Sequence, residues 1–327
     1  MRKLYYRDPY AAQGEGMVGF RSLPLPGGPA GGDCQHRLAF PGTIGRKGHG
    51  SGDPDIPRRR DALMKKYLTI FRISWQRELE YRFNFLLGRL RSIVVLLLLY
   101  YIWHTLSSAT GTFAGYTQRE LITYVLGATI LRSIVFGTQA RSVAAEINDG
   151  TFSTYLVKPV NHFLFVFFRE LAQRSICTVS AVIEVALFSV LVDARIFLQV
   201  DWRWLVLFVV ATGLAIALYS LLSYTINLIA FWSREAMGPK FMFDWFLEFS
   251  SGAYFPMDIL GAGLFVAFAS LPFFYLLFFP IGVYLGRYTG WQVGGGIAMQ
   301  VVWIGIGAHV ARFVWARGLM RFTGEGI

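Results

Sequence analysis

Charged residues stand inside apolar stretches of this sequence, where a charge needs a partner. Arg132 lies about 11 residues into one stretch, and Glu184 lies about 10 residues past Arg174 in another, so a rise of about 1.5 Å per residue places both near mid-membrane depth. An isolated charge at that depth costs on the order of 3 kcal/mol, so we predict an ion pair between Arg132 and Glu184. This pair either holds two adjacent helices together or contacts a substrate.

Asp244 and Glu248 form a second candidate site that we expect within the membrane. The two carboxylates are four residues apart, so they share one face of a helix. Neither side chain can face acyl chains without a large penalty. They therefore either line a cavity that attracts cations or contact the local helix end that carries Arg234 and Lys240.

The residue patterns of common catalytic sites are missing from the sequence. A phosphate-binding loop needs Gly-x-x-x-x-Gly-Lys-Ser/Thr, and residues 45–48 lack both the spacing and the hydroxyl residue. A serine nucleophile needs an elbow such as Gly-x-Ser-x-Gly, which no apolar stretch contains. Cysteines and histidines are too scattered for a disulfide framework or a metal site: Cys34, Cys177, His36, His49, His104, His162 and His309. We expect no catalytic residue, cofactor or metal in this chain, which disfavours an enzyme acting alone, a membrane-embedded lipid enzyme included.

A polar interval between two apolar stretches carries the most specific pattern. Gly150 ends one helix, and Pro159 stops the next element. Between them, Phe152, Tyr155 and Leu156 have the i, i+3, i+4 spacing of an apolar helix face. Such a face suits docking into a groove of a partner protein, and it suits equally a loop helix that lies on the membrane.

The composition requires a membrane to solvate most of the chain. Hydrophobic residues make up 54% of the sequence and charged residues 16%, and the mean hydropathy is +0.46. A helix that crosses a bilayer needs about 20 apolar residues. We predict an all-α polytopic membrane protein with six transmembrane helices, over residues 90–108, 121–139, 164–192, 203–232, 237–254 and 292–315.

Three further segments complete the expected organisation. Residues 1–63 form a basic, Gly- and Pro-rich extension that cannot bury a core, so they are either a disordered tail or the result of a mis-assigned start before Met64. The transmembrane domain follows over residues 64–327 and begins with an amphipathic, interfacial helix at about 65–88. Residues 255–290 are apolar but broken by prolines and glycines, which predicts short re-entrant helices on the external side before the last span.

We attribute the net charge of +11 to contact with a membrane rather than with a nucleic acid. Lysines and arginines gather on alternate connections between the spans, which predicts that both termini are cytosolic. Basic residues beside apolar spans attract anionic headgroups, so we expect membrane lipids and no nucleic acid as partners.

Two segments resemble one family of transporters. The polar interval 146–160 resembles the cytosolic signature of type-2 ATP-binding-cassette (ABC) exporter permeases, through Glu146, Gly150, Thr151, Tyr155, Leu156, Lys158 and Pro159. The second segment resembles the external re-entrant helices of the same family, through Gly252, Phe255, Pro256, Pro272 and Pro280. Gly261 departs from the pattern, because a proline is expected there.

The resemblance covers residues 64–327 and is strongest to a six-span bacterial subgroup similar to antibiotic and viologen exporters. It implies a permease subunit that forms half of a translocation pathway and pairs with a second copy or a related permease. The 146–160 segment, with Phe152 on its apolar face, would couple the chain to a separate ATPase subunit. ATP and Mg²⁺ would bind that ATPase, with no cofactor in this chain.

The alternative is an ion-coupled secondary transporter or channel without an ATPase partner, which could use the intramembrane charges. Both hypotheses place the chain in the bacterial cytoplasmic membrane as a multi-pass protein. The transported substrate stays open, since an apolar pathway suits drugs, lipids or glycan-lipid conjugates alike.

Overall fold

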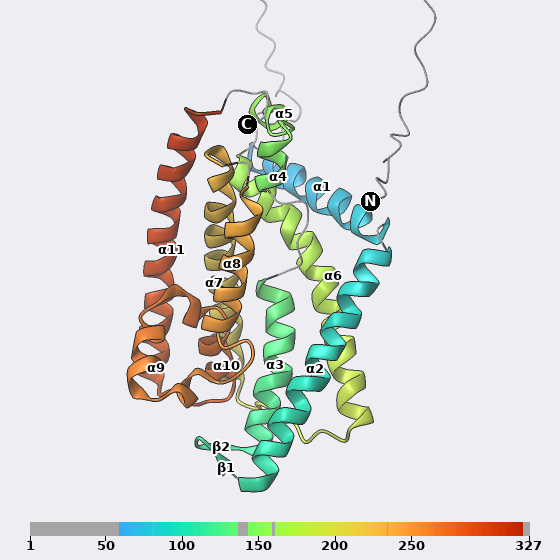
Figure 1. Ribbon diagram of the computed structural model, residues 1–327, viewed down its shortest axis with the longest axis vertical. Coiled ribbons are helices and arrows are strands. Elements are labelled where there is room, and N and C mark those ends of the chain that lie inside the picture. Colours follow the sequence, from blue (N-terminus) through green and yellow to red (C-terminus); the bar gives the residue numbers. More distant parts are fainter. Residues whose placement is uncertain are drawn as a thin grey trace, which may run out of the picture. The chain divides into compact units, whose positions relative to one another are not determined.

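The computed structural model describes residues 59–80, 82–110, 112–136, 143–158, 161–233 and 235–322 (Figure 1). Residues 1–58 of the predicted extension lie outside these described residues. The first described element is helix α1 (Arg59–Glu80), and the predicted domain boundary at residues 63 and 64 falls within it.

Helices make up most of the described chain. The long helices are α2 (Arg82–Thr110), α3 (Gln118–Val135), α6 (His162–Leu191), α7 (Trp202–Asn227) and α11 (Gly290–Leu319). Shorter helices connect them: α4 (Val143–Asn148), α5 (Ser153–Leu156), η1 (Leu228–Phe231), α8 (Met237–Ser250), η2 (Met257–Leu260), α9 (Ala262–Ala269), η3 (Pro272–Tyr275) and α10 (Phe278–Tyr284). The prediction of a purely α fold is wrong in one detail, because β1 (Thr112–Phe113) and β2 (Tyr116–Thr117) form a small antiparallel hairpin.

Four helical segments of the described chain are long and apolar enough to cross a membrane. They cover Phe85–Ser108, His162–Leu191, Trp202–Phe231 and Gly290–Leu319. The pair α9 and η3–α10, bent by 79°, would make a fifth if it were one broken span. The other two predicted spans fall short: α3 has 18 residues that include Arg119, Glu120 and Arg132, and α8 has only 14 residues. The protein is thus mostly helical with four to five candidate spans.

The predicted interfacial stretch at 65–88 is divided between two helices. Its first part belongs to α1, which packs against α6 through a stacked pair of rings, Tyr67 and Phe168, and a hydrogen bond from Trp75 Nε1 to Ser175 Oγ (3.0 Å). Its last residues belong to α2, whose candidate span begins at Phe85. The position of α1 at a membrane surface stays a prediction.

Prolines and glycines break the chain after α8 into the short helices η2, α9, η3 and α10, as their spacing predicts. Pro272 is the first residue of η3 and Pro280 the third of α10, positions at which a helix does not need a backbone N–H donor. Gly261, at the junction of η2 and α9, has φ +82°. Proline fixes φ near −65°, so the proline expected at residue 261 could not adopt this conformation.

The core lies where α3, α7 and α10 meet. Among its fully buried large side chains are Tyr116, Tyr124 and Phe279. Gln300 of α11 is also fully buried, and its Nε2 donates to Ala211 O of α7 and to Tyr275 O of η3, each at 3.0 Å. This one amide therefore connects three elements.

The short elements of the described chain are grouped at two opposite ends of the long helices. The elements α1, α4 and α5 lie towards the same end of the long helices as the C-terminal end of α11, in the upper part of Figure 1, whereas β1, β2, α9 and α10 lie towards the opposite end. Near the top, a methyl group at Gly318 of α11 would overlap the ring of Phe231, so glycine permits close packing of α11 on η1.

Candidate functional site

The polar interval folds as a helix, a tight turn and a second short helix. Helix α4 runs to Asn148, and Gly150 follows with φ +73°, a backbone conformation that glycine adopts without strain. The N–H of Phe152 then donates to Glu146 O (2.9 Å), and Thr151 Oγ1 donates to the same carbonyl oxygen (3.3 Å). These bonds close the turn before the single-turn helix α5.

Phe152 anchors this turn in the protein. Its side chain is fully buried, and its ring meets those of His162, Phe231, Trp315 and Phe322 edge to face. The expectation that Phe152 shares an exposed face with Tyr155 and Leu156 is therefore wrong. The turn at Gly150 rotates Phe152 inward, which helical spacing along the sequence cannot reveal.

Glu146 is a second anchor rather than a contact surface. Its side chain is 4% exposed, and its Oε1 accepts a hydrogen bond from Arg169 Nη1 of α6, whose side chain is 7% exposed. Two charges that are both buried need this mutual contact, because either one alone would be desolvated without compensation. The ion pair thus ties α4 to α6.

The surface of the segment is formed by residues at the end of α5. Leu156 is 46% exposed and Val157 is 87% exposed, and both Lys158 and Thr151 are exposed as well. Tyr155 is half-buried, with its ring against Phe165 and His162. Pro159 lies outside the described residues.

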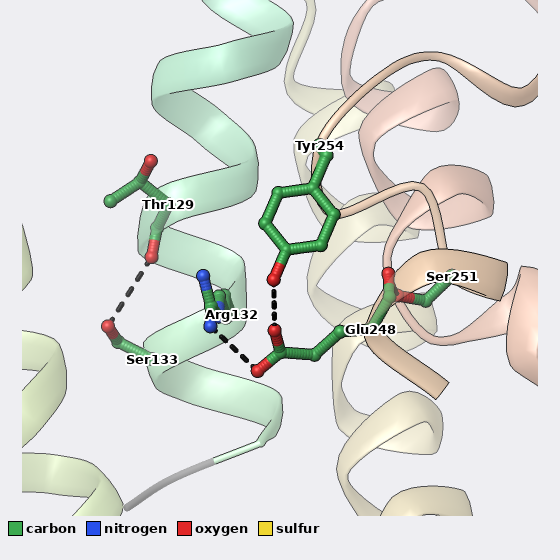
Figure 2. A network of polar contacts seen from close by, with 6 residues as sticks. All are labelled: Thr129, Arg132, Ser133, Glu248, Ser251 and Tyr254. Atoms are coloured by element: carbon green, nitrogen blue, oxygen red, sulfur yellow. Dashed lines mark hydrogen bonds and ion pairs between the residues drawn. The ribbon is translucent and has the colours of Figure 1, made fainter. Parts of the chain in front are cut away.

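Arg132, the arginine predicted to lie within the membrane, has a different partner from the one predicted. Arg132 Nη2 of α3 lies 2.7 Å from Glu248 Oε1 of α8, and Tyr254 Oη donates to the other oxygen of Glu248 (Figure 2). The Tyr254 ring also lies 5.7 Å from the Arg132 guanidinium. Trp103 Nε1 of α2 donates to Tyr254 O (3.0 Å), so this polar cluster joins three parts of the chain.

Glu184 pairs with Arg89 of α2 at 3.7 Å, not with Arg132. Their side chains are 13% and 11% exposed, respectively, and Arg89 Nη1 also donates to Cys177 O (3.4 Å). The expected Arg132–Glu184 pair is therefore wrong, because Glu184 points to α2 whereas Arg132 points to α8. Similar predicted depths in the membrane suggested the pair, but depth does not determine which helix faces are in contact.

Asp244 contacts the cation at the start of its own helix. Its Oδ2 lies 2.6 Å from Lys240 Nζ, one turn earlier in α8. Asp244 and Glu248 thus make separate ion pairs. Arg234, the other cation considered for this position, lies outside the described residues.

Comparison with models of protein families matches residues 93–326 to ABC-2 family transporter proteins. This chain belongs to that family. The match covers the polar segment, the Arg132–Glu248 and Lys240–Asp244 pairs and the broken helices described above, and it begins after Arg89, the partner of Glu184. No curated protein and no solved structure matches the chain.

This ABC-2 family protein is therefore the multi-pass membrane component of a transporter. Members of this permease family carry no ATPase domain, and ABC permeases generally pair with ATPase subunits. Within the described part of the chain, no three residues of the types His, Cys, Asp and Glu gather as metal ligands would.

Two tyrosines contact the segment of this ABC-2 protein that is predicted to be external. Gly252 has φ +80°, and Tyr124 Oη of α3 donates to its carbonyl oxygen (2.6 Å) and to Phe255 O (3.3 Å). A Cβ atom at residue 252 would lie 2.6 Å from Tyr124 Oη, so glycine is required there. Pro256 follows and leads into η2 in an extended conformation.

Tyr116 of β2 makes the other connection to this region. Its hydroxyl donates to Asp258 Oδ2 of η2 (2.8 Å), and the Arg287 guanidinium lies 3.6 Å from the centre of its ring. Burial raises the pKa of the Asp258 carboxyl above its ordinary value, despite the opposing effects of the Tyr116 hydrogen bond and of Arg287. The hairpin is thus fixed to the broken helices.

Sequence reasoning missed several residues that shape these sites. Val157 was overlooked because a lone valine next to a lysine gives no periodic signal, yet it is the most exposed apolar side chain of the segment. Arg169 and Tyr254 are partners of predicted residues from other elements, and their roles depend on tertiary contacts.

Proposed function

We propose that this protein is the permease subunit of an ATP-driven exporter and forms half of a translocation pathway. A second copy or a related permease would supply the other half. A separate ATPase subunit would bind the segment 146–160 and hydrolyse ATP at its own site. The subgroup similar to antibiotic and viologen exporters remains the preferred one, on the resemblance of its sequence motifs.

The main support is the contrast between the anchored and the exposed parts of the segment. Leu156, Val157 and Lys158 project from α5 as a small apolar patch beside a positive charge. A single exposed valine is ordinary on a protein surface, but Val157 adjoins the exposed Leu156, and together they are suited to a groove on a partner protein.

The two buried residues of the segment, Phe152 and Glu146, would transmit movement from the exposed patch to the membrane helices. Phe152 is wedged against Trp315 of α11, and Glu146 is paired with Arg169 of α6. A partner that displaces α5 would therefore move the ends of α6 and α11 together, because tightly packed interiors transmit displacement. Rocking of these helices would open and close the pathway between the two permeases.

A six-span arrangement is consistent with this proposal. It adds α3 and α8 to the four long apolar helices and makes the bent α9–α10 region re-entrant rather than a span. The charges in the interiors of α3 and α8 are paired, Arg132 with Glu248 and Lys240 with Asp244, which lowers the penalty of placing them at depth. Six crossings would put both termini on the cytosolic side of a bacterial inner membrane.

The decisive experiment is co-purification from the native membrane in mild detergent. We expect an ATPase to accompany the wild-type protein and to be lost from Val157→Asp, because a charge in the apolar contact disrupts docking. Val200→Asp is the matched control: Val200 is 89% exposed and lies in the loop between α6 and α7, at the opposite end of these helices.

Reproducible absence of an ATPase from the wild-type preparation would favour the ion-coupled secondary transporter. Retention of the ATPase by Val157→Asp would contradict the assignment of this segment as the coupling surface. The intramembrane carboxylates Asp244, Glu248 and Glu184 each have a cationic partner, which weighs against their use as free ion-coupling groups.

A further inference from the structure

A groove of about 480 Å³ opens between η1 and the last turns of α11. Ile229, Phe313 and Val314 give it an apolar floor, and Trp232 lies at one wall. Phe313 is 55% exposed and Trp232 is 40% exposed, so these rings stand open to the surroundings of the protein. A volume of this size is in the range of small-molecule sites.

The sequence of α11 places the groove at the edge of the hydrocarbon layer. No Asp, Glu, Lys or Arg occurs in the 22 residues from Gly290 to Ala311. At about 1.5 Å per residue this stretch spans about 33 Å, close to the thickness of about 30 Å of a hydrocarbon core. The arginines that follow therefore lie in the headgroup layer, where indole rings such as that of Trp232 also prefer to be.

Two arginines stand at the headgroup end of the groove. Arg317 and Arg321 are four residues apart, at the C-terminal end of α11 and just beyond it, and both are exposed. Neither has an ion-pair partner within the part of the chain that the structure describes. The guanidinium of Arg317 lies over the ring of Phe313, 5.0 Å from its centre.

We propose that this groove binds an anionic phospholipid of the leaflet beside α4 and α5. Its phosphate would lie between Arg317 and Arg321, and an acyl chain would lie along Phe313 and Ile229. Charge complementarity supports this occupant, since two unpaired cations lie at phosphate depth and the floor below them is apolar. Such a site requires only that α7 and α11 cross the bilayer, and it does not require an ATPase partner.

The test is a titration of phosphatidylglycerol into the detergent-purified full chain, with bound lipid counted by native mass spectrometry. We expect phosphatidylglycerol to bind more tightly than phosphatidylcholine. The variant Arg317→Gln/Arg321→Gln should bind phosphatidylglycerol about 30-fold more weakly, because each basic residue near an anionic surface contributes about a factor of five. Inorganic phosphate should not compete, since it lacks the acyl chain.

Arg195→Gln/Arg203→Gln is the matched control, because it removes the same charge from two exposed arginines around the loop between α6 and α7. Its affinity for phosphatidylglycerol should remain that of the wild type. Wild-type affinity in the Arg317→Gln/Arg321→Gln variant would overturn the proposal. So would effective competition by inorganic phosphate, or loss of a co-purifying ATPase from that variant with lipid binding intact.

Discussion

Individual residues in this protein are stabilised by partners that lie far away in the sequence. Arg132 and Glu248 are 2.7 Å apart, with side chains 26% and 20% exposed, and Tyr254 completes the carboxylate's hydrogen bonding. Removing one member of a largely buried ion pair leaves the other charge desolvated, whereas removing both often has little effect. The two kinds of change therefore have different consequences.

Replacement of Arg132 by methionine should lower the free energy of unfolding by about 2 kcal/mol, because Glu248 keeps its charge without its cation. The double variant Arg132→Met/Glu248→Met should recover most of that loss. Thermal unfolding of the detergent-solubilised protein measures both.

Lys240→Met provides the comparison on α8. It also removes one cation from a largely buried ion pair, whose side chains are 11% and 20% exposed, so it should likewise lower the free energy of unfolding by about 2 kcal/mol. A loss below about 0.5 kcal/mol in both variants, which is the contribution of an exposed ion pair, would contradict the argument from burial.

Sequence reasoning at this scale identified the need for partners but not the partners. Arg132 was recognised from its charge and its predicted depth in the membrane, and both quantities are properties of one helix. The choice between Glu184 and Glu248 depends on how α2, α3, α6 and α8 rotate about their axes, which is fixed by packing. The partner of Asp244, by contrast, lies one turn away in the same helix, and a contact of this kind can be predicted from sequence spacing alone.

At the scale of elements, the α4–α5 segment combines a rigid base and an exposed tip. Gly150 and the polar run predicted its break and its short second helix correctly. Helical periodicity wrongly predicted that Phe152 shares an exposed face with Leu156, because the tight turn places Phe152 in the core while Leu156 stays exposed. The two residues should thus respond differently to the same truncation.

Phe152→Ala should lower the free energy of unfolding by about 3 kcal/mol, because it empties a site among four aromatic rings. Leu156→Ala should change stability by no more than about 0.5 kcal/mol, as expected for a surface position, but should weaken ATPase association. Thermal unfolding and co-purification measure the two effects separately.

Tyr155→Phe serves as a control within the segment, since it keeps the ring against Phe165 and removes only the hydroxyl. Equal destabilisation by Phe152→Ala and Leu156→Ala would contradict the distinction between base and tip.

At the scale of the whole molecule, the two ends of the helices should face opposite sides of the membrane. Composition located the four long apolar helices near their predicted positions, because about 20 apolar residues in a row is a local signal. It could not establish α3 and α8 as spans, since these helices are short or charged and their suitability depends on neighbours.

Single cysteines at Thr154 and Val200 should react differently with a membrane-impermeant maleimide, after the native Cys34 and Cys177 are replaced by serine. In intact cells, Val200→Cys should be labelled and Thr154→Cys should not, because α5 is expected on the cytosolic side. Both should react after permeabilisation, which confirms that each site is accessible. Labelling of both in intact cells would disprove the proposed orientation.

The amide of Gln300 has a consequence for any motion of this protein. Its two bonds to Ala211 O and Tyr275 O hold α11, α7 and η3 in one register deep inside the protein. A slide of α11 along α7 would break both bonds and leave buried polar groups unsatisfied. These helices should therefore move as one rigid unit, so that a transport cycle bends the protein at the border of this unit with α3 rather than between α7 and α11.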